Sequence, residues 1–181
     1  LLGYAENING KIYQRVHPTF IKKSSYIAKI DGVLNAVIVD GKPVGQSLIQ
    51  GEGAGPEATT SALISDISSI LRGNIKFPFT SPDKERKKLF FDNISKQVFS
   101  SYFRFDVQDK QGVLSDITSV MAKQKVSIKR LIQNPFKSKK FSSIIVITHE
   151  STDKQLSNVI KILKNKKYLI KKPKYIRIEN I

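Results

Sequence analysis

Hydrophobic and polar positions in residues 97–181 switch between the period of strands and the period of helices. Phe99, Phe103, Phe105 and Val107 stand at alternating positions, which predicts a half-buried strand. The expected elements are a strand at 99–107, a helix at 113–121, strands at 126–132 and 141–148, a helix at 156–163 and a strand at 176–178. This βαββαβ order predicts a ferredoxin-like sandwich, in which two helices cover one face of an antiparallel sheet.

Residues 1–73 have the pattern of a small sheet followed by a helix. After a short extended run at 13–16, two apolar runs at 33–39 and 44–49 flank Asp40-Gly41, a pair suited to a hairpin turn. Pro56 suits the first turn of a helix and Gly73 its end. The apolar residues of this helix share one stripe, which comprises Leu63, Ile67, Ile70 and Leu71. The fold class is therefore α+β: a partial β-sheet with a covering helix, followed by the ferredoxin-like unit.

Residues 74–96 separate these two parts and show no sustained period. They contain Pro78, Pro82 and several lysines, which favours a linker with a short helix near 84–91. A basic turn is expected at 136–140. The predicted domains are thus 1–73, a linker at 74–96, and 97–181.

Composition excludes several classes of protein. The 181 residues include no cysteine and only two histidines, His17 and His149, so disulfides, thiolate metal sites and a cysteine nucleophile are excluded and no metal site is expected. No run of about 18 apolar residues suggests a membrane span, and no signal peptide pattern opens the chain. We expect a cytoplasmic protein.

The net charge of +16 raises the question of a nucleic-acid or membrane partner. The excess is concentrated in residues 74–181, which hold 24 basic and 9 acidic side chains. However, 25 of the 31 basic residues are scattered lysines rather than arginines, which recognise bases and phosphates better. We expect neither a nucleic acid nor a membrane as partner. A basic RNA- or membrane-associated protein stays an alternative, because Phe99, Phe103 and Phe105 could form a stacking platform, although one-sided alternation is more simply core.

A glycine-rich turn precedes the first predicted helix. Gly51, Gly53 and Gly55 would let the backbone approach a ligand closely, and the helix start offers free N–H groups to an anion. The spacing fits neither the dinucleotide fingerprint nor a phosphate-binding loop. A tight turn without a ligand is an equal alternative on these residues alone.

Several blocks in residues 1–73 give the turn a context. In order and interval they resemble the substrate and dimerisation region of homoserine dehydrogenases. The blocks are Arg15-Val16-His17-Pro18-Thr19, Asp31-Gly32-Val33-Leu34-Asn35-Ala36-Val37, Gly51-Glu52-Gly53-Ala54-Gly55-Pro56-Glu57-Ala58-Thr59-Thr60-Ser61-Ala62 and Asp66.

The resemblance implies an NAD(P)-dependent oxidoreductase that interconverts L-aspartate 4-semialdehyde and L-homoserine, on the branch toward threonine and methionine. In that family the Rossmann domain and the catalytic lysine precede this region. We therefore assign no catalytic residue here, expect the back part of a longer protein, and expect no turnover from this chain alone. What carries over is the glycine turn, where Gly55, then Gly53 and Ala54, would lie against the NADP or NAD cofactor.

A second turn, Asp109-Lys110-Gln111-Gly112-Val113-Leu114, joins a predicted strand to a helix. Within the βαββαβ order it resembles the ACT domain, a regulatory amino-acid-binding module, with Gln111 in place of the usual proline. The resemblance implies an amino-acid effector, threonine by analogy. The residues expected to hold it are Asp109, Gly112, Val113, Leu114, Gln133 and Asn134. An ACT fold used only for association is the alternative.

The remaining polar candidates have weaker assignments. His17, beside Pro18, is interpreted as a packed structural histidine, and Arg15 as pairing across a dimer interface or facing solvent. The expected partners are a small-molecule substrate, an amino-acid effector and a second copy of the chain. A non-catalytic amino-acid-binding or association protein with an ACT module is the competing hypothesis.

Overall fold

The computed structural model describes residues 1–74, 82–86, 88–136 and 140–181. By its contacts the chain forms two compact units. One comprises Leu1–Ile21 and Leu89–Ile181, and the other Lys22–Lys88. The first unit therefore joins the N-terminal segment to the C-terminal part of the chain. No helix among the described residues is long and apolar enough to span a membrane.

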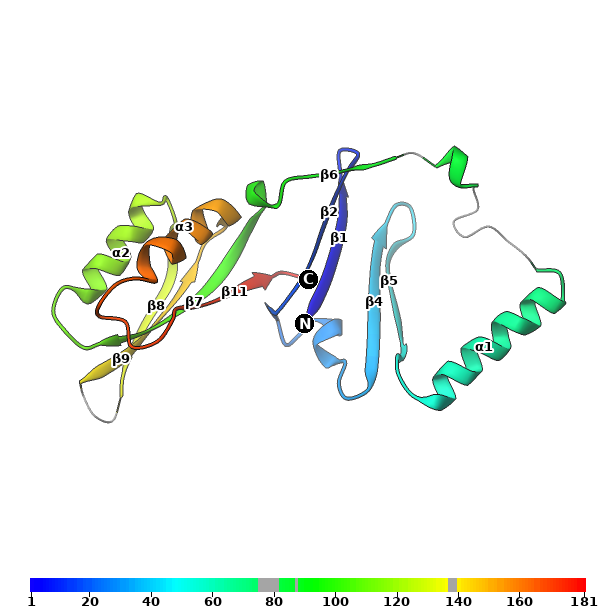
Figure 1. Cartoon of the computed structure of the whole chain (residues 1–181), viewed down its shortest axis with the longest axis horizontal. Coiled ribbons are helices and arrows are strands. Elements are labelled where there is room, and N and C mark those ends of the chain that lie inside the picture. Colours follow the sequence, from blue (N-terminus) through cyan, green and yellow to red (C-terminus); the bar gives the residue numbers. More distant parts are fainter. Residues whose placement is uncertain (75–81, 87, 137–139) are drawn as a thin grey trace. The chain divides into compact units, whose positions relative to one another are not determined.

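The larger part of the first unit is the expected ferredoxin-like sandwich (Figure 1). Its elements are β7 (Val98–Gln108), α2 (Val113–Lys123), β8 (Ile128–Pro135), β9 (Phe141–Thr148), α3 (Asp153–Leu163) and β11 (Lys174–Glu179). The strands lie in the order β11-β7-β9-β8, and each neighbouring pair is antiparallel. The α+β class and the βαββαβ order are confirmed.

The core of this unit lies between the sheet and its two helices. Alternating residues of β7 and β9 point toward the helices, and each helix buries one stripe against them. The buried cluster contains Phe99, Phe103, Phe105, Val107, Val113, Ile117, Val120, Met121, Val126, Ile144, Val146, Leu156, Val159 and Leu163. The start of α3 is fixed by a capping box, in which the Thr152 hydroxyl accepts from the Gln155 N–H and the Gln155 side chain accepts from the Thr152 N–H. Thr152 also belongs to β10 (Ser151–Thr152), which pairs with β7.

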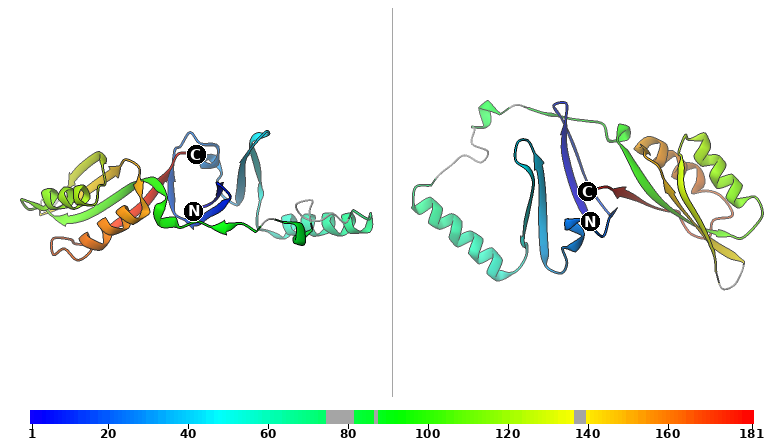
Figure 2. Two further views of the ribbon diagram at one scale, coloured as in Figure 1. Left: turned by 90° about the horizontal axis from the view of Figure 1, so that it is seen from above. Right: turned by 180° about the vertical axis from the view of Figure 1, so that it is seen from behind.

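The N-terminal segment extends this sheet, which the sequence did not indicate. After the hairpin β1 (Leu2–Ile8) and β2 (Lys11–His17), strand β3 (Thr19–Ile21) pairs in parallel with β11. On the other side of the hairpin, β6 (Phe90–Phe91) pairs with β2. Figure 2 shows the hairpin of β1 and β2 from two further directions. β1 lacks a clean hydrophobic alternation, and β3 is too short to carry one.

The second unit contains an antiparallel hairpin and a helix. β4 (Leu34–Gly41) and β5 (Gly45–Glu52) pair along their whole length, from Leu34 opposite Glu52 to Gly41 opposite Gly45. The turn therefore lies at residues 42–44 and not at Asp40-Gly41, because the strands extend further than the apolar runs do. Short 3-10 helices at Tyr26–Lys29 and Asp83–Glu85 complete the unit.

Helix α1 (Pro56–Leu71) has the expected bounds but buries none of its residues. The side chains of its apolar stripe are between 51% and 82% exposed, and Val37 and Ile49 of the hairpin are exposed as well. The expectation that this helix covers a sheet is thus not met within this chain.

The segment expected as a linker differs from the prediction in its details. Among its described residues, the Asp83–Glu85 turn, β6 and a 3-10 turn at Ile94–Lys96 take the place of the short helix expected near 84–91. Residue 87 lies outside the described residues. The basic turn expected at 136–140 also falls largely outside them, at 137–139.

Candidate functional site

The connection between β7 and α2 is a tight turn that begins where β7 ends. Gly112, just before the helix, has φ 84° and ψ −17°, a left-handed conformation that costs glycine little. The Asp109 N–H donates to the Lys140 carbonyl at 2.9 Å, which ties the turn to the start of β9. The turn is therefore held from both sides, by the strand it leaves and by the neighbouring strand.

A cavity of about 180 Å³ lies beside this turn. Its walls come from β7, the turn, α2, β8 and β9. The lining residues are Val107, Gln108, Asp109, Lys110, Gln111, Gly112, Val113, Leu114, Gln133, Ser142 and Ile144. The cavity combines apolar walls with a carboxylate, an ammonium group and an amide, which is the mixture needed to hold a small zwitterion.

The polar wall of the cavity is organised around Gln133 on β8. Its Nε2 lies 3.3 Å from Asp109 Oδ1 and 3.3 Å from the hydroxyl of Ser142, which is fully buried on β9. One amide thus orients a carboxylate and a hydroxyl that come from two other elements. The side chains that meet at this wall come from β8, from β9 and from the turn that follows β7.

The opposite side of the cavity is the start of α2. The first N–H groups of a helix lack intrahelical partners and attract anions. Asp116 in the first turn of α2 is engaged elsewhere, since its carboxylate accepts from Lys166 Nζ and from the Tyr168 hydroxyl at 2.8 Å. The bonds from Lys166 and Tyr168 lower the pKa of Asp116. This carboxylate is thus committed to tying α2 to the segment that follows α3.

Five of the six residues expected to hold an effector line this cavity, namely Asp109, Gly112, Val113, Leu114 and Gln133. Asn134 is not among the lining residues, because it follows Gln133 on β8 and adjacent strand residues point to opposite faces. Ser142, Val107 and Ile144 were not foreseen. Their strand positions alternate toward the helix face, and pairing β9 against both β7 and β8 would have been needed to place them. The ligand-binding role of these residues stays a prediction.

The glycine turn between β5 and α1 has a conformation that requires glycine. Gly55 caps the helix with φ 126° and ψ 152°, a region closed to other residues. A side chain at Gly53 would place its Cβ 2.1 Å from Nδ2 of Asn35, whereas the Cβ position at Gly55 faces open space. Gly53, Ala54 and Gly55 are all exposed in this chain. Their role in cofactor binding stays a prediction.

Arg15 and His17, the remaining polar candidates, both lie in the first unit. Arg15 pairs with Glu179 of β11 in the same chain and its side chain is 6% exposed, so the expectation that it faces solvent was wrong. Its pairing across a dimer interface stays a prediction. His17 is partly buried, and its pKa is lowered by burial and by the nearby Arg177 and Arg15. No group of three or more metal-ligating side chains occurs in the described residues.

Comparisons of the sequence with protein families give two matches. A family profile described as homoserine dehydrogenase matches residues 1–68, and one described as ACT domain matches residues 101–167. Among curated proteins, a homoserine dehydrogenase of Helicobacter pylori is 36% identical over 183 residues and one of Neisseria gonorrhoeae is 32% identical over 190 residues. They align with 99% and 100% of this chain. The chain spans only 42% and 43% of their lengths.

A solved structure extends this agreement to three dimensions. The crystal structure of a homoserine dehydrogenase from Thiobacillus denitrificans superposes with a TM-score of 0.82 at 30% sequence identity. The match covers 98% of this chain and 41% of that protein.

Proposed function

Because residues 1–68 belong to the homoserine dehydrogenase family and residues 101–167 form an ACT domain, we propose that this chain is the C-terminal, regulatory part of an NAD(P)-dependent homoserine dehydrogenase. The enzyme interconverts L-aspartate 4-semialdehyde and L-homoserine. The observation that supports the regulatory role is the cavity beside Gly112, which is lined by five of the six residues expected to hold an effector. Within this protein we assign residues 1–73 to the substrate and dimerisation domain, 74–96 to a linker and 97–181 to the ACT domain.

The cavity is suited to a single amino acid. Its volume of about 180 Å³ lies below the roughly 300–1,000 Å³ of pockets for larger ligands. In our proposal the N–H groups at the start of α2 receive the ligand's carboxylate, and the Asp109 carboxylate receives its ammonium group. Gly112 keeps the approach to the helix start free of a side chain.

The side walls favour a short side chain with both a methyl and a hydroxyl group, so we propose L-threonine as the effector. Val107, Val113 and Ile144 offer apolar contacts, while Gln133 and the buried Ser142 offer hydrogen bonds. The Gln133 amide and the buried Ser142 hydroxyl already contact each other, but both can make further hydrogen bonds, which a ligand hydroxyl can use and a purely apolar side chain cannot. Valine should therefore bind less tightly than threonine.

Titration calorimetry of the 181-residue chain tests the effector site. We expect L-threonine to bind, valine to bind more weakly and D-threonine not to bind. Asp109→Asn should weaken binding by about tenfold, since a charged partner contributes more than a neutral one. Glu150→Gln, which changes an exposed acidic residue near the other end of the sheet, is the matched control and should bind like the wild type. Equal affinities for the two variants would contradict the assignment.

The bend at 53–55 is proposed as the part of this chain that meets the cofactor. Gly55 fits this role because it holds a conformation closed to side chains and its Cβ position is open, so a ligand can approach the backbone. When bound, the nicotinamide supplies or accepts the hydride. Gly53 and Ala54 complete the bend, and their part is to allow close packing rather than to transfer protons.

The substrate, the oligomeric state and the location belong to the same proposal. We propose that the chain associates with a second copy and acts in the cytoplasm. The exposed apolar residues of β4, β5 and α1 support association, because such a surface is rarely left in contact with water.

A further inference from the structure

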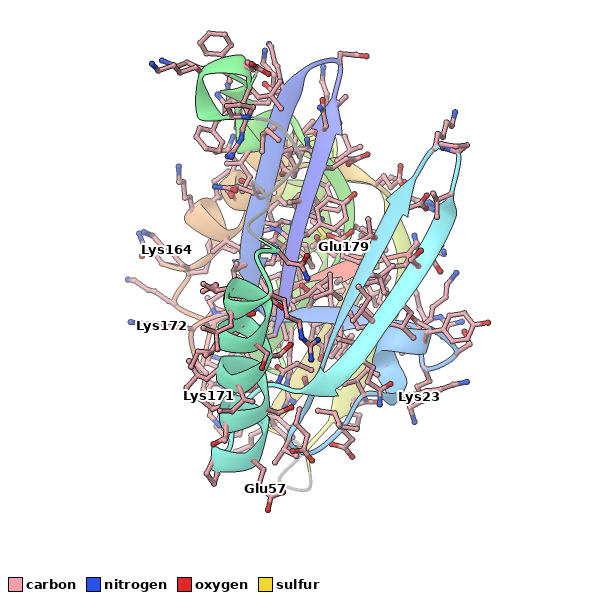
Figure 3. All side chains as sticks on the ribbon, turned by 90° about the vertical axis from the view of Figure 1, so that its right-hand side faces the viewer. Lys23, Glu57, Lys164, Lys171, Lys172 and Glu179 are labelled. Atoms are coloured by element: carbon pink, nitrogen blue, oxygen red, sulfur yellow. The ribbon has the colours of Figure 1, made fainter. Side chains whose placement is uncertain are left out.

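The hairpin of β1 and β2 lies against the last strand of the ACT domain. Tyr13, Arg15 and His17 alternate along one face of β2. Tyr13 is only 1% exposed, and Arg15 contacts Glu179 of β11. Glu179, labelled in Figure 3, lies at the end of β11, directly beside the point where β3 joins the sheet. A segment that matches the homoserine dehydrogenase family is thus built into the ACT fold.

The centre of this junction is the ion pair between Arg15 and Glu179, two residues 164 positions apart. Their side chains are only 6% and 13% exposed. The Arg15 guanidinium also lies over the ring of Tyr4, at 4.2 Å from its centroid, and over that of Tyr13, at 5.3 Å. An ion pair shielded from water in this way is costly to break from one side, because the remaining charge stays buried without a partner.

A second ion pair continues the junction into the ACT domain. Arg177 of β11 pairs with Asp153 at the start of α3, and both side chains are largely buried. The ring of Phe99 lies near both guanidinium groups, at 4.8 Å from that of Arg177 and 6.0 Å from that of Arg15. Phe99 therefore links the hairpin's arginine to the strand β7 and to the core.

Several buried polar atoms surround these pairs. Within the described part of the chain, no hydrogen-bond partner is found for the Tyr13 and Tyr175 hydroxyls, the Ser101 hydroxyl, His17 Nε2 or Arg177 Nε. Each buried polar atom without a partner costs free energy, so the packing around the two ion pairs is less favourable than that of an apolar core. The attachment of the hairpin therefore depends strongly on the ion pair between Arg15 and Glu179.

One continuous strand reaches from this junction to the effector cavity. Val107 and Gln108 of β7 line the cavity, while Phe99 and Ser101 of the same strand lie in the junction. β7 is also the central partner of both β11 and β9. β7 therefore connects the cavity directly to the residues that hold the hairpin.

We propose that this junction is the coupling element between the ACT domain and the homoserine dehydrogenase segment. Arg15 is its positioning residue: it fixes the hairpin on β11, so that the order of the hairpin follows the state of the effector cavity. The coupling to an effector rests on the function proposed above, whereas the attachment of the hairpin through Arg15 does not.

Hydrogen exchange of the full 181-residue chain, followed by mass spectrometry, tests the attachment without any ligand. Arg15→Met should raise the exchange rate of the β1 and β2 amides by about tenfold or more, because a lost buried partner lowers the cost of local opening. Lys11→Met is the matched control, since it removes an exposed cation from the same strand. Equal hairpin exchange in the two variants would overturn the proposal.

Swapping the charges of Arg15 and Glu179 distinguishes a lost ion pair from a variant that fails to fold. Arg15→Glu and Glu179→Arg should each increase hydrogen exchange in the hairpin, and the double variant should exchange more slowly than either single variant.

Repeating the hydrogen-exchange measurement with L-threonine tests the coupling. The wild type should gain protection at the start of α2 and in the hairpin, and Arg15→Met at α2 alone. A hairpin response that survives in Arg15→Met, or is absent from the wild type while α2 responds, overturns the coupling. No response at α2 in the wild type contradicts the proposed effector instead.

Discussion

Gly112 determines the start of α2 by adopting a left-handed conformation, with φ 84°. Any residue other than glycine is strained in this conformation. Asparagine is strained less than alanine, because it tolerates the left-handed region. At the scale of single residues, the effector cavity depends on this one position, since the start of α2 forms one of its walls.

We therefore expect Gly112→Ala to lower the free energy of unfolding of the first unit by about 1–2 kcal/mol. Gly112→Asn should lower it by less. Urea unfolding followed by far-UV circular dichroism measures both changes. A variant with alanine that is as stable as the wild type would show that the left-handed turn is not required.

His17 gives the junction a dependence on pH. Burial, followed by the charges of Arg177 and Arg15, lowers its pKa from the usual 6.5, while Asp153 acts in the opposite direction. The unfolded chain therefore takes up a proton at a higher pH than the folded chain does. The contribution of His17 to stability is complete above 6.5 and is lost as the pH falls from there through the lowered folded value.

Accordingly, wild-type stability should decrease more steeply between neutral pH and a pH of about 5 than that of His17→Gln. Urea unfolding at a series of pH values measures the difference. Parallel pH profiles for the two proteins would show that His17 does not titrate in this way.

At the scale of elements, the two amphipathic helices contribute half of the buried core residues of the ACT domain. Helix α3 buries Leu156, Val159 and Leu163, whereas its neighbour Ile162 is 42% exposed. The two adjacent residues are of similar size and differ mainly in burial, so they separate packing from helix propensity.

Leu163→Ala should reduce the free energy of unfolding by about 2–5 kcal/mol, the cost of lost burial together with a cavity. Ile162→Ala should cost about 1 kcal/mol or less, because little of its surface leaves water. Chemical unfolding of both variants provides the comparison. A similar loss for both would contradict the packing of α3 described above.

The elements also show where sequence patterns are sufficient. Helix α3 and strand β7 have a clear period, because one side of each faces a core and the other faces water. The turn at 109–114 and Gln133 were also located correctly beside one another, since in a ferredoxin-like sheet the third strand lies between the first and the second, and the turn after the first strand can reach across it. Local pattern and fold order were enough for these features.

Other features depend on partners that no local pattern reveals. β3 is three residues long and pairs with β11 near the other end of the chain. The contact between Arg15 and Glu179 accompanies this long-range pairing, so the expectation that Arg15 faces solvent failed. The stripe of α1 was recognised correctly as apolar, but an apolar stripe does not indicate which surface covers it, and within this chain α1 remains exposed.

At the scale of the whole molecule, the family boundaries and the physical units divide the chain differently. The homoserine dehydrogenase match covers residues 1–68 without interruption, whereas residues 1–21 pack with the ACT domain and residues 22–88 form a unit of their own. The ACT domain thus packs directly with part of the sequence that matches the homoserine dehydrogenase family.

The net charge of +16 follows from lysines on many elements rather than from a single patch. Lys164, Lys171 and Lys172 project from the ribbon in Figure 3 and are exposed.

The most direct test of the account is the activity of the full-length protein that contains this chain. Homoserine-dependent reduction of NADP⁺ or NAD⁺ should be measurable, and L-threonine should decrease it, while the 181-residue chain alone should show no turnover. A full-length protein that reduces neither cofactor with homoserine would contradict the dehydrogenase assignment. An active enzyme whose rate is the same at all threonine concentrations would contradict the regulatory role of the cavity beside Gly112.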